Sequence, residues 1–206
     1  MADFTGRSGP MCHKLSICLD INRWLFTMTE SGFPLTNVMK ALELYLQGII
    51  TKLKHCFLYV SVIAHMSECN ATYLLWKGVI DTHEHNSSKS FPAIGLLVRV
   101  INCRLGEMED DLQKYLSSAM TGLGGSVSGR TGKYPELSSF LSCCFRQLQD
   151  LPQEALPTVV LFTQGIMNAN MAHLQTLVSK STPIYLVFMK FSSVSPPTIH
   201  CNLAML

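Results

Sequence analysis

Residues 57–64 form the run Phe-Leu-Tyr-Val-Ser-Val-Ile-Ala, and this run constrains the fold more than any other feature of the sequence. It is rich in β-branched and aromatic residues, which favour strands. It also lacks the regular alternation of apolar and polar residues that marks a strand with one wet face. The sequence therefore predicts a strand that is buried on both faces, as in a parallel sheet flanked by helices.

Three further runs, at 15–21, 158–162 and 184–191, have the same apolar character. Between the runs lie segments whose apolar residues recur at the period of an α-helix. These predicted helices lie at 35–53, 94–115, 137–148 and 170–179. Residues 72–80 predict one more strand, antiparallel and at the sheet edge. The order of elements predicts an α/β fold: a three-layer, Rossmann-like domain with a mostly parallel central sheet, one antiparallel edge strand and helices on both faces.

The length of 206 residues suits a single domain. We assign that domain to residues 14–192, with an N-terminal tail at 1–13 and a C-terminal tail at 193–206. Residues 121–133 are rich in Gly and Ser and have no periodicity, which predicts a flexible loop within the domain.

Charge and hydropathy exclude two classes of partner. The net charge is +2 and the Lys and Arg residues are scattered, whereas a protein that holds a phosphate backbone shows a clustered basic face. No apolar stretch reaches the roughly 18 residues that a membrane-spanning helix needs. The first ten residues carry one Arg and no apolar run, so they do not resemble a secretory signal. We therefore expect no direct binding of nucleic acid and no insertion into a membrane.

The eight cysteines are predicted to be reduced and buried. Cys18 lies within an apolar run and Cys56 at the edge of another, while Cys103 and Cys144 fall on predicted apolar helical faces. No Cys-x-x-Cys pair is present, which argues against a zinc site. In a chain without a secretory signal, such residues pack as small apolar side chains.

Several other residues are candidates for a binding or catalytic site, but the residues around them do not support that role. The Gly-rich segment at 124–133 lacks key residues of a phosphate-binding loop and follows a helix instead of a strand. His83 and His85 have no third metal ligand, and His65 ends a strand without a visible partnered nucleophile. The acidic residues at 107–111 suit the wet face of a helix. We therefore predict no catalytic residue, no cofactor and no enzymatic activity.

The ends of two predicted strands carry the best candidate site, because ligand sites in parallel sheets form beyond the carboxyl ends of the strands. Asp20, Asn22 and Trp24 follow the first strand, and Thr163 and Gln164 follow the fourth. This layout resembles the von Willebrand factor A (vWA) family, which binds a divalent metal there through Asp-x-Ser-x-Ser and, commonly, Thr-Asp-Gly.

The resemblance implies a degenerate metal site, because Asn22, Trp24 and Gln164 stand where the family has ligands. Mg²⁺ gives up its water reluctantly and favours hard, charged oxygen ligands, and only one carboxylate is left here. We therefore expect no bound metal. The expected role of Asp20 is structural, with its carboxylate accepting hydrogen bonds from backbone amides of the loop.

Within the vWA superfamily, three segments resemble the smaller vWA-like subunit of general transcription factor IIH. They are Asp-Ile-Asn-Arg-Trp at 20–24, Val-Ile-Ala-His at 62–65 with Tyr-Leu-Leu-Trp at 73–76, and Leu-Phe-Thr-Gln-Gly at 161–165. The resemblance covers residues 14–192. It stops at the carboxyl end, where the family carries a cysteine-rich zinc module and this chain has only Cys201.

The resemblance implies a non-enzymatic scaffold in the nucleus, in the core of transcription factor IIH, acting in RNA polymerase II transcription initiation and nucleotide excision repair. Its partners would be the larger vWA-containing subunit and other core subunits, in a hetero-oligomer. Trp24, Phe26 and Trp76 are the candidate partner-binding residues, because aromatic side chains are favoured at binding hot spots. For each of them, packing within the loop or the sheet edge is the alternative.

Three other hypotheses stay open at this point. The chain could be a metal-dependent ligand binder, as adhesion-type vWA domains are. It could be an interaction domain of another intracellular complex, such as the vWA-like region of the lysosomal KICSTOR scaffold. It could also be a nucleotide-dependent enzyme that uses the Gly-rich loop.

Overall fold

The structure is a computed structural model, and it describes residues 11–26, 34–53, 56–66, 71–82, 87–121, 137–151, 155–163, 184–189 and 199–200. The strands are β1 (Met11–Ile21), β2 (Cys56–Met66), β3 (Ala71–Asp81), β4 (Leu156–Thr163), β5 (Ile184–Met189) and β6 (Ile199–His200). The helices are the short 3-10 helix η1 (Arg23–Phe26), α1 (Pro34–Lys52), α2 (Ser87–Thr121) and α3 (Leu137–Gln149). The predicted helix at 170–179 lies outside the described residues, as do residues 122–133 of the predicted loop.

The described strands form one sheet in the order β3-β2-β1-β4-β5-β6. β1 lies in the middle and is parallel to both β2 and β4, and β4 is parallel to β5. β3 is antiparallel to β2 at the edge. The predicted α/β fold, with a mostly parallel sheet and an antiparallel edge strand, is thus confirmed.

The sheet also extends into both segments that the sequence assigns to tails. β1 begins at Met11, inside the N-terminal segment 1–13. The two-residue strand β6 lies inside the C-terminal segment 193–206 and pairs antiparallel with β5, which adds a second antiparallel pair to the one expected. A strand of two residues has no periodicity to detect, so this pairing carries no sequence signal.

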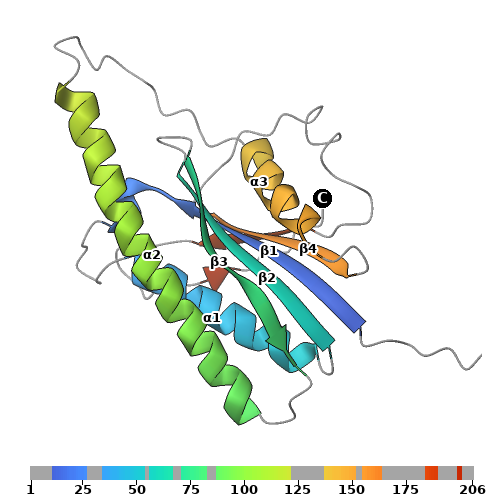
Figure 1. Ribbon diagram of the computed structural model, residues 1–206. Helices are drawn as coiled ribbons and strands as arrows, with labels where there is room; N and C mark the ends of the chain where they lie inside the picture. Colours follow the sequence, from blue (N-terminus) through green and yellow to red (C-terminus); the bar gives the residue numbers. More distant parts are fainter. Residues whose placement is uncertain are drawn as a thin grey trace, which may run out of the picture.

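Helices cover both faces of the sheet, giving three layers (Figure 1). α1 and α2 pack on one face, and α2 runs alongside the edge strand β3. α3 packs on the opposite face, against β1, β2 and β4. Predicted helical periods at 35–53, 94–115 and 137–148 correspond to these three helices, and α2 is longer than predicted at both ends.

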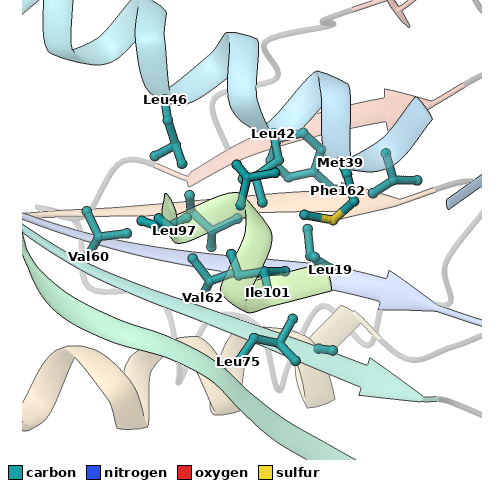
Figure 2. Packing of buried hydrophobic residues seen from close by; sticks show 14 of the residues in the cluster. Leu19, Met39, Leu42, Leu46, Val60, Val62, Leu75, Leu97, Ile101 and Phe162 are labelled. Carbon is teal, nitrogen blue, oxygen red and sulfur yellow. The ribbon is translucent and has the colours of Figure 1, made fainter. Parts of the chain in front are cut away.

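The larger hydrophobic core fills the space between the sheet and the helices α1 and α2. Successive side chains of a strand point to opposite faces, so alternate residues of the three central strands enter this core. The ring of Phe162 meets that of Tyr45 edge to face, with centroids 5.7 Å apart. Figure 2 shows buried side chains from both layers meeting here, among them Leu19, Met39, Leu42, Leu46, Val60, Val62, Leu75, Leu97, Ile101 and Phe162.

A smaller core lies under α3, on the other face of the sheet. Its helical side consists of residues such as Phe140, Leu141 and Leu148. Its strand side differs from the first core, because it also contains buried polar residues of β1, β2 and β4. These are Ser16, Asp20, Ser61, His65 and Thr163. The polar side chains at the strand ends therefore lie on the face that α3 covers.

Candidate functional site

Asp20 and Thr163 meet at the carboxyl ends of two neighbouring parallel strands. Asp20 is the penultimate residue of β1 and Thr163 is the last residue of β4. The hydroxyl Oγ1 of Thr163 donates a hydrogen bond of 2.9 Å to Oδ2 of Asp20. Both residues are buried, with 4% and 1% of their surface exposed. The sequence analysis assigned both residues to one candidate site. It expected backbone amides as the hydrogen-bond donors to Asp20 and did not predict the Thr163 hydroxyl as a donor.

The segment after β1 turns at Asn22. Its backbone carbonyl accepts a hydrogen bond of 3.1 Å from the amide of Leu25, which opens the 3-10 helix η1. Leu25 is fully buried and anchors this turn in the larger core. Asn22 therefore stays next to Asp20, and the backbone of Trp24 lies in η1. The side chain of Trp24 and all of Gln164 lie outside the described residues.

His65 is the penultimate residue of β2 and pairs in register with Asp20. Its Nδ1 lies 2.9 Å from the hydroxyl Oγ1 of Thr72 on β3, and that oxygen lies 3.3 Å from Sγ of Cys143 on α3. The imidazole also meets the ring of Phe140 edge to face, at 4.6 Å between centroids. Burial lowers the pKa of His65, so the neutral imidazole is favoured. His65 is thus a buried histidine, and its Nδ1 has a hydrogen-bond partner.

Cys18 of β1 and Cys144 of α3 are both buried in the smaller core. Burial raises the pKa of the Cys18 thiol, and a hydrogen bond with Cys144 raises it further. A thiol with a raised pKa stays protonated at neutral pH and is a poor nucleophile. All six described cysteines are free, as predicted. The predicted burial was wrong for Cys103, whose side chain is exposed on the outer face of α2, and Cys12 and Cys143 are only half-buried.

Two candidate aromatic residues are half-buried. Phe26 of η1 and Trp76 of β3 pack against the larger core. The indole of Trp76 lies across Gly78, where an added Cβ would stand only 2.6 Å from ring atoms Cη2 and Cζ2. Gly78 is therefore needed for the indole to lie along the strand, a requirement that the sequence did not reveal. A contact of Phe26 or Trp76 with a partner stays a prediction.

The described residues include no group of three or more His, Cys, Asp or Glu side chains placed to hold a metal ion. His83, His85 and the Gly-rich segment at 124–133 lie outside the described residues. Of the acidic residues at 107–111, three are exposed on α2, as the sequence predicted, and Glu109 is half-buried. Among the described helices, none has the length and apolar character to cross a membrane.

The chain has a vWA-like fold. A mostly parallel sheet lies between helices, β3 forms its antiparallel edge, and Asp20 and Thr163 stand at the carboxyl ends of β1 and β4. No protein-family model and no curated protein sequence matches the chain, so this assignment comes from the structure.

Solved structures similar to this one include the N-terminal domain of TFIIH p34, with a TM-score of 0.50 and 11% sequence identity, over 85% of this chain and 80% of that one. The conserved hypothetical protein BatB from Bacteroides thetaiotaomicron has a TM-score of 0.45 and 10% identity, over 94% and 80% of the two chains. The manganese-loaded TRAP protein of Plasmodium vivax has a TM-score of 0.41 and 15% identity, over 86% and 58%. The likeness to the p34 domain is one of fold.

Proposed function

We propose that this chain is a non-enzymatic scaffold for protein–protein interaction, and that it serves as a core subunit of transcription factor IIH. The observation that carries the proposal is the closed contact between Asp20 and Thr163. The single carboxylate at this end of the central strand is buried and hydrogen-bonded inside the protein. We therefore assign Asp20 a structural role at the end of the sheet. The surface around it is then free for contact with other proteins.

The chemistry of the neighbouring positions supports a structural role for Asp20. A divalent cation needs several oxygen ligands, of which some are usually charged, to offset the loss of its water. The sequence supplies Asn22 and Trp24 at the positions after Asp20, and Gln164 after Thr163. A carboxamide is a weaker ligand than a carboxylate, and an indole is none.

A metal-dependent binder is the second candidate, favoured by one feature of the same contact. A threonine hydroxyl that donates its proton to a carboxylate keeps its lone pairs for a cation. Thermal denaturation in Mg²⁺, in Mn²⁺ and in a chelator separates the two functions, because a ligand that binds the folded state raises its melting temperature. The scaffold predicts the same melting temperature in all three. A rise with either metal that Asp20→Asn abolishes would establish the metal-dependent function instead.

The assignment to transcription factor IIH rests on the three sequence segments described above and on the fold shared with the p34 domain. By the same resemblance its site of action is the nucleus and its roles are transcription initiation by RNA polymerase II and nucleotide excision repair. Its partners would be the larger vWA-containing subunit and other core subunits. The proposed complex is a hetero-oligomer, in which this chain makes no direct contact with nucleic acid.

Affinity purification of the tagged full chain from its own cells, with identification of the co-purifying proteins, tests this assignment. Recovery of the larger vWA subunit and the helicases of factor IIH is expected. Recovery of a different stable complex, such as a KICSTOR-like scaffold, would overturn the assignment and leave the scaffold function standing. A chain that purifies alone, without any stoichiometric partner, would contradict both.

The half-buried Trp76 offers a sharper version of the experiment. Trp76→Phe keeps an aromatic side chain over Gly78 but removes the indole N–H and part of the ring surface. We expect weaker capture of the partner, because Trp is favoured at interface hot spots. Leu156→Ala is the matched control, since Leu156 is exposed at the start of β4. If both variants capture equal amounts of the partner and have equal melting temperatures, the prediction that Trp76 contacts the partner is wrong.

A further inference from the structure

A chain of three polar side chains joins α3 to the edge of the sheet. Nδ1 of His65 lies 2.9 Å from Oγ1 of Thr72, and the same oxygen lies 3.3 Å from Sγ of Cys143. The three residues come from β2, β3 and α3, and His65 pairs in register with Thr72 across the two strands. One hydroxyl therefore links a thiol to an imidazole, which places a nucleophile within reach of a base.

This chain of side chains runs from a buried base to an accessible thiol. His65 is only 4% exposed, and the ring of Phe140 packs edge to face against its imidazole. Thr72 is exposed, and Cys143 is half-buried at the border of the smaller core. A small reagent can therefore reach the sulfur from solvent, while packing holds the imidazole in place.

Both tautomers of a neutral imidazole favour loss of the Cys143 proton. Burial lowers the pKa of His65, so its ring is neutral at neutral pH. If Nδ1 carries no proton, Thr72 donates to it and the thiol donates to Thr72, so the thiol proton can pass along the chain of side chains. If Nδ1 carries the proton, it donates to Thr72, whose own proton is then directed at the sulfur and stabilises a thiolate. The thiolate is the reactive form of cysteine.

Three other thiols lack this combination of access and base. Cys18 and Cys144 are buried and form a hydrogen bond with each other, and burial raises the pKa of Cys18. Cys103 is exposed, but it belongs to α2, which packs on the opposite face of the sheet from α3 (Figure 1). Among these four thiols, Cys143 alone is both open to solvent and linked to an imidazole.

We propose that Cys143 is a site of oxidation by hydrogen peroxide, with the Thr72 hydroxyl linking its thiol to His65 as proton acceptor. The sulfur attacks one peroxide oxygen, an S–O bond forms and the O–O bond breaks. The thiol proton passes through Thr72 to His65 and then to the leaving hydroxide. Cys143 becomes a sulfenic acid, oxidised by two electrons, and the peroxide is reduced to water. This inference does not depend on the proposed scaffold function and can fail without affecting it.

Treatment of the reduced full chain with hydrogen peroxide and dimedone, which traps sulfenic acids, tests the proposal. Peptide mass spectrometry reads each cysteine separately in one sample, so Cys103 serves as the internal control. Wild type should be labelled faster at Cys143 than at Cys103, although Cys103 is the more exposed of the two. Equal or slower labelling at Cys143 would overturn the proposal, because exposure alone would then govern oxidation.

Variants of the two linked residues test the path of the proton. Thr72→Val removes the hydroxyl with little change of shape and should slow labelling at Cys143 by about tenfold or more. His65→Gln should slow it similarly, since a carboxamide does not take up a proton near neutral pH. Thr72→Ser keeps the hydroxyl and is the matched control, with a rate near that of wild type.

Labelling at Cys103 should be the same in all of these variants. A folded Thr72→Val chain that is labelled at Cys143 as fast as wild type would overturn the proposal. Labelling of the buried Cys18 would show that a variant has unfolded, and the comparison of Cys143 with Cys103 in wild type then decides.

Discussion

The two faces of the sheet are built from the same strands but carry different chemistry. In β1 the residues Leu15, Ile17, Leu19 and Ile21 enter the core under α1 and α2. The intervening residues Ser16, Cys18 and Asp20 face α3. Because strand side chains alternate between faces, one strand supplies apolar packing at odd positions and the candidate site at even positions.

The two faces also differ in how their helices are held. α1 and α2 contact the sheet through a large apolar cluster. α3 has a smaller cluster, and the helix and the residue that follows it add polar contacts to two strands. Gln147 accepts a long hydrogen bond of 3.5 Å from Ser61, and Asp150 forms an exposed ion pair of 3.4 Å with Lys77. We infer from this comparison that the face under α1 and α2 supplies most of the stability. The opposite face positions α3 over the polar strand ends.

The largest effect is expected from a cavity in the apolar face. Phe162 is 1% exposed and packs against Tyr45 of α1. Phe162→Ala should lower the free energy of unfolding by about 4 kcal/mol, because it removes buried surface and leaves a cavity. Urea denaturation followed by circular dichroism measures the change.

Leu156→Ala is the matched control on the same strand. Leu156 is 54% exposed, so its truncation should change stability by no more than about 0.5 kcal/mol. Comparable losses in Phe162→Ala and Leu156→Ala would contradict the assignment of the main core to the face under α1 and α2.

A smaller effect is expected at the strand ends of the α3 face. Asp20→Asn keeps the shape of the side chain but removes the charge that strengthens the hydrogen bond from Thr163. It should cost about 2 kcal/mol of folding free energy, the range for a hydrogen bond to a charged group. Thr163→Val removes the donor with little change of shape, and the double variant should cost less than the sum of the two. Strict additivity would show that the two side chains do not interact.

The architecture could be predicted because it depends on features that a sequence displays directly. Apolar runs without alternation indicated buried strands, and helical periods between them indicated helices. The edge position of β3 agrees with its burial, because exposed and half-buried residues alternate along most of its length. The exposed Cys103 was placed wrongly because the helical stripe of α2 is apolar on its outer side as well.

The contacts within the candidate site could be predicted only in part. Asp20 and Thr163 follow apolar strands, so their meeting at the sheet end could be expected from parallel pairing. The contacts that join His65, Thr72 and Cys143 could not, because they depend on the register between β2 and β3 and on the position of α3. That register shifts at Val62 and Ile63, and nothing in the sequence marks the irregularity.

The third prediction concerns a buried hydroxyl in the middle of the α3 face. Among the described residues, the Oγ atom of Ser16 is buried and has no hydrogen-bond partner. Ser16→Ala should therefore leave stability unchanged or raise it by up to about 1 kcal/mol, because it removes an unsatisfied polar group. Ser61 pairs with Ser16 in register and does donate to Gln147, so Ser61→Ala should instead lower stability by up to about 1 kcal/mol. In denaturation experiments only the Ser61→Ala curve should shift to lower stability, and a loss in both variants would contradict the difference between these hydroxyls.

The smallest effect is a pH dependence that the α3 face should show and the apolar face should not. Burial lowers the pKa of His65 in the folded chain below its value of about 6.5 in the unfolded chain. The unfolded state therefore binds the proton more readily, and stability should fall as the pH drops from about 6.5 towards the folded pKa. His65→Gln should flatten the curve of unfolding free energy between about pH 7.5 and pH 5. Thr72→Val should keep the pH dependence of the wild type, because burial and not the Thr72 hydroxyl causes the lowered pKa of His65. A Thr72→Val curve as flat as that of His65→Gln would assign the effect to the hydrogen bond instead.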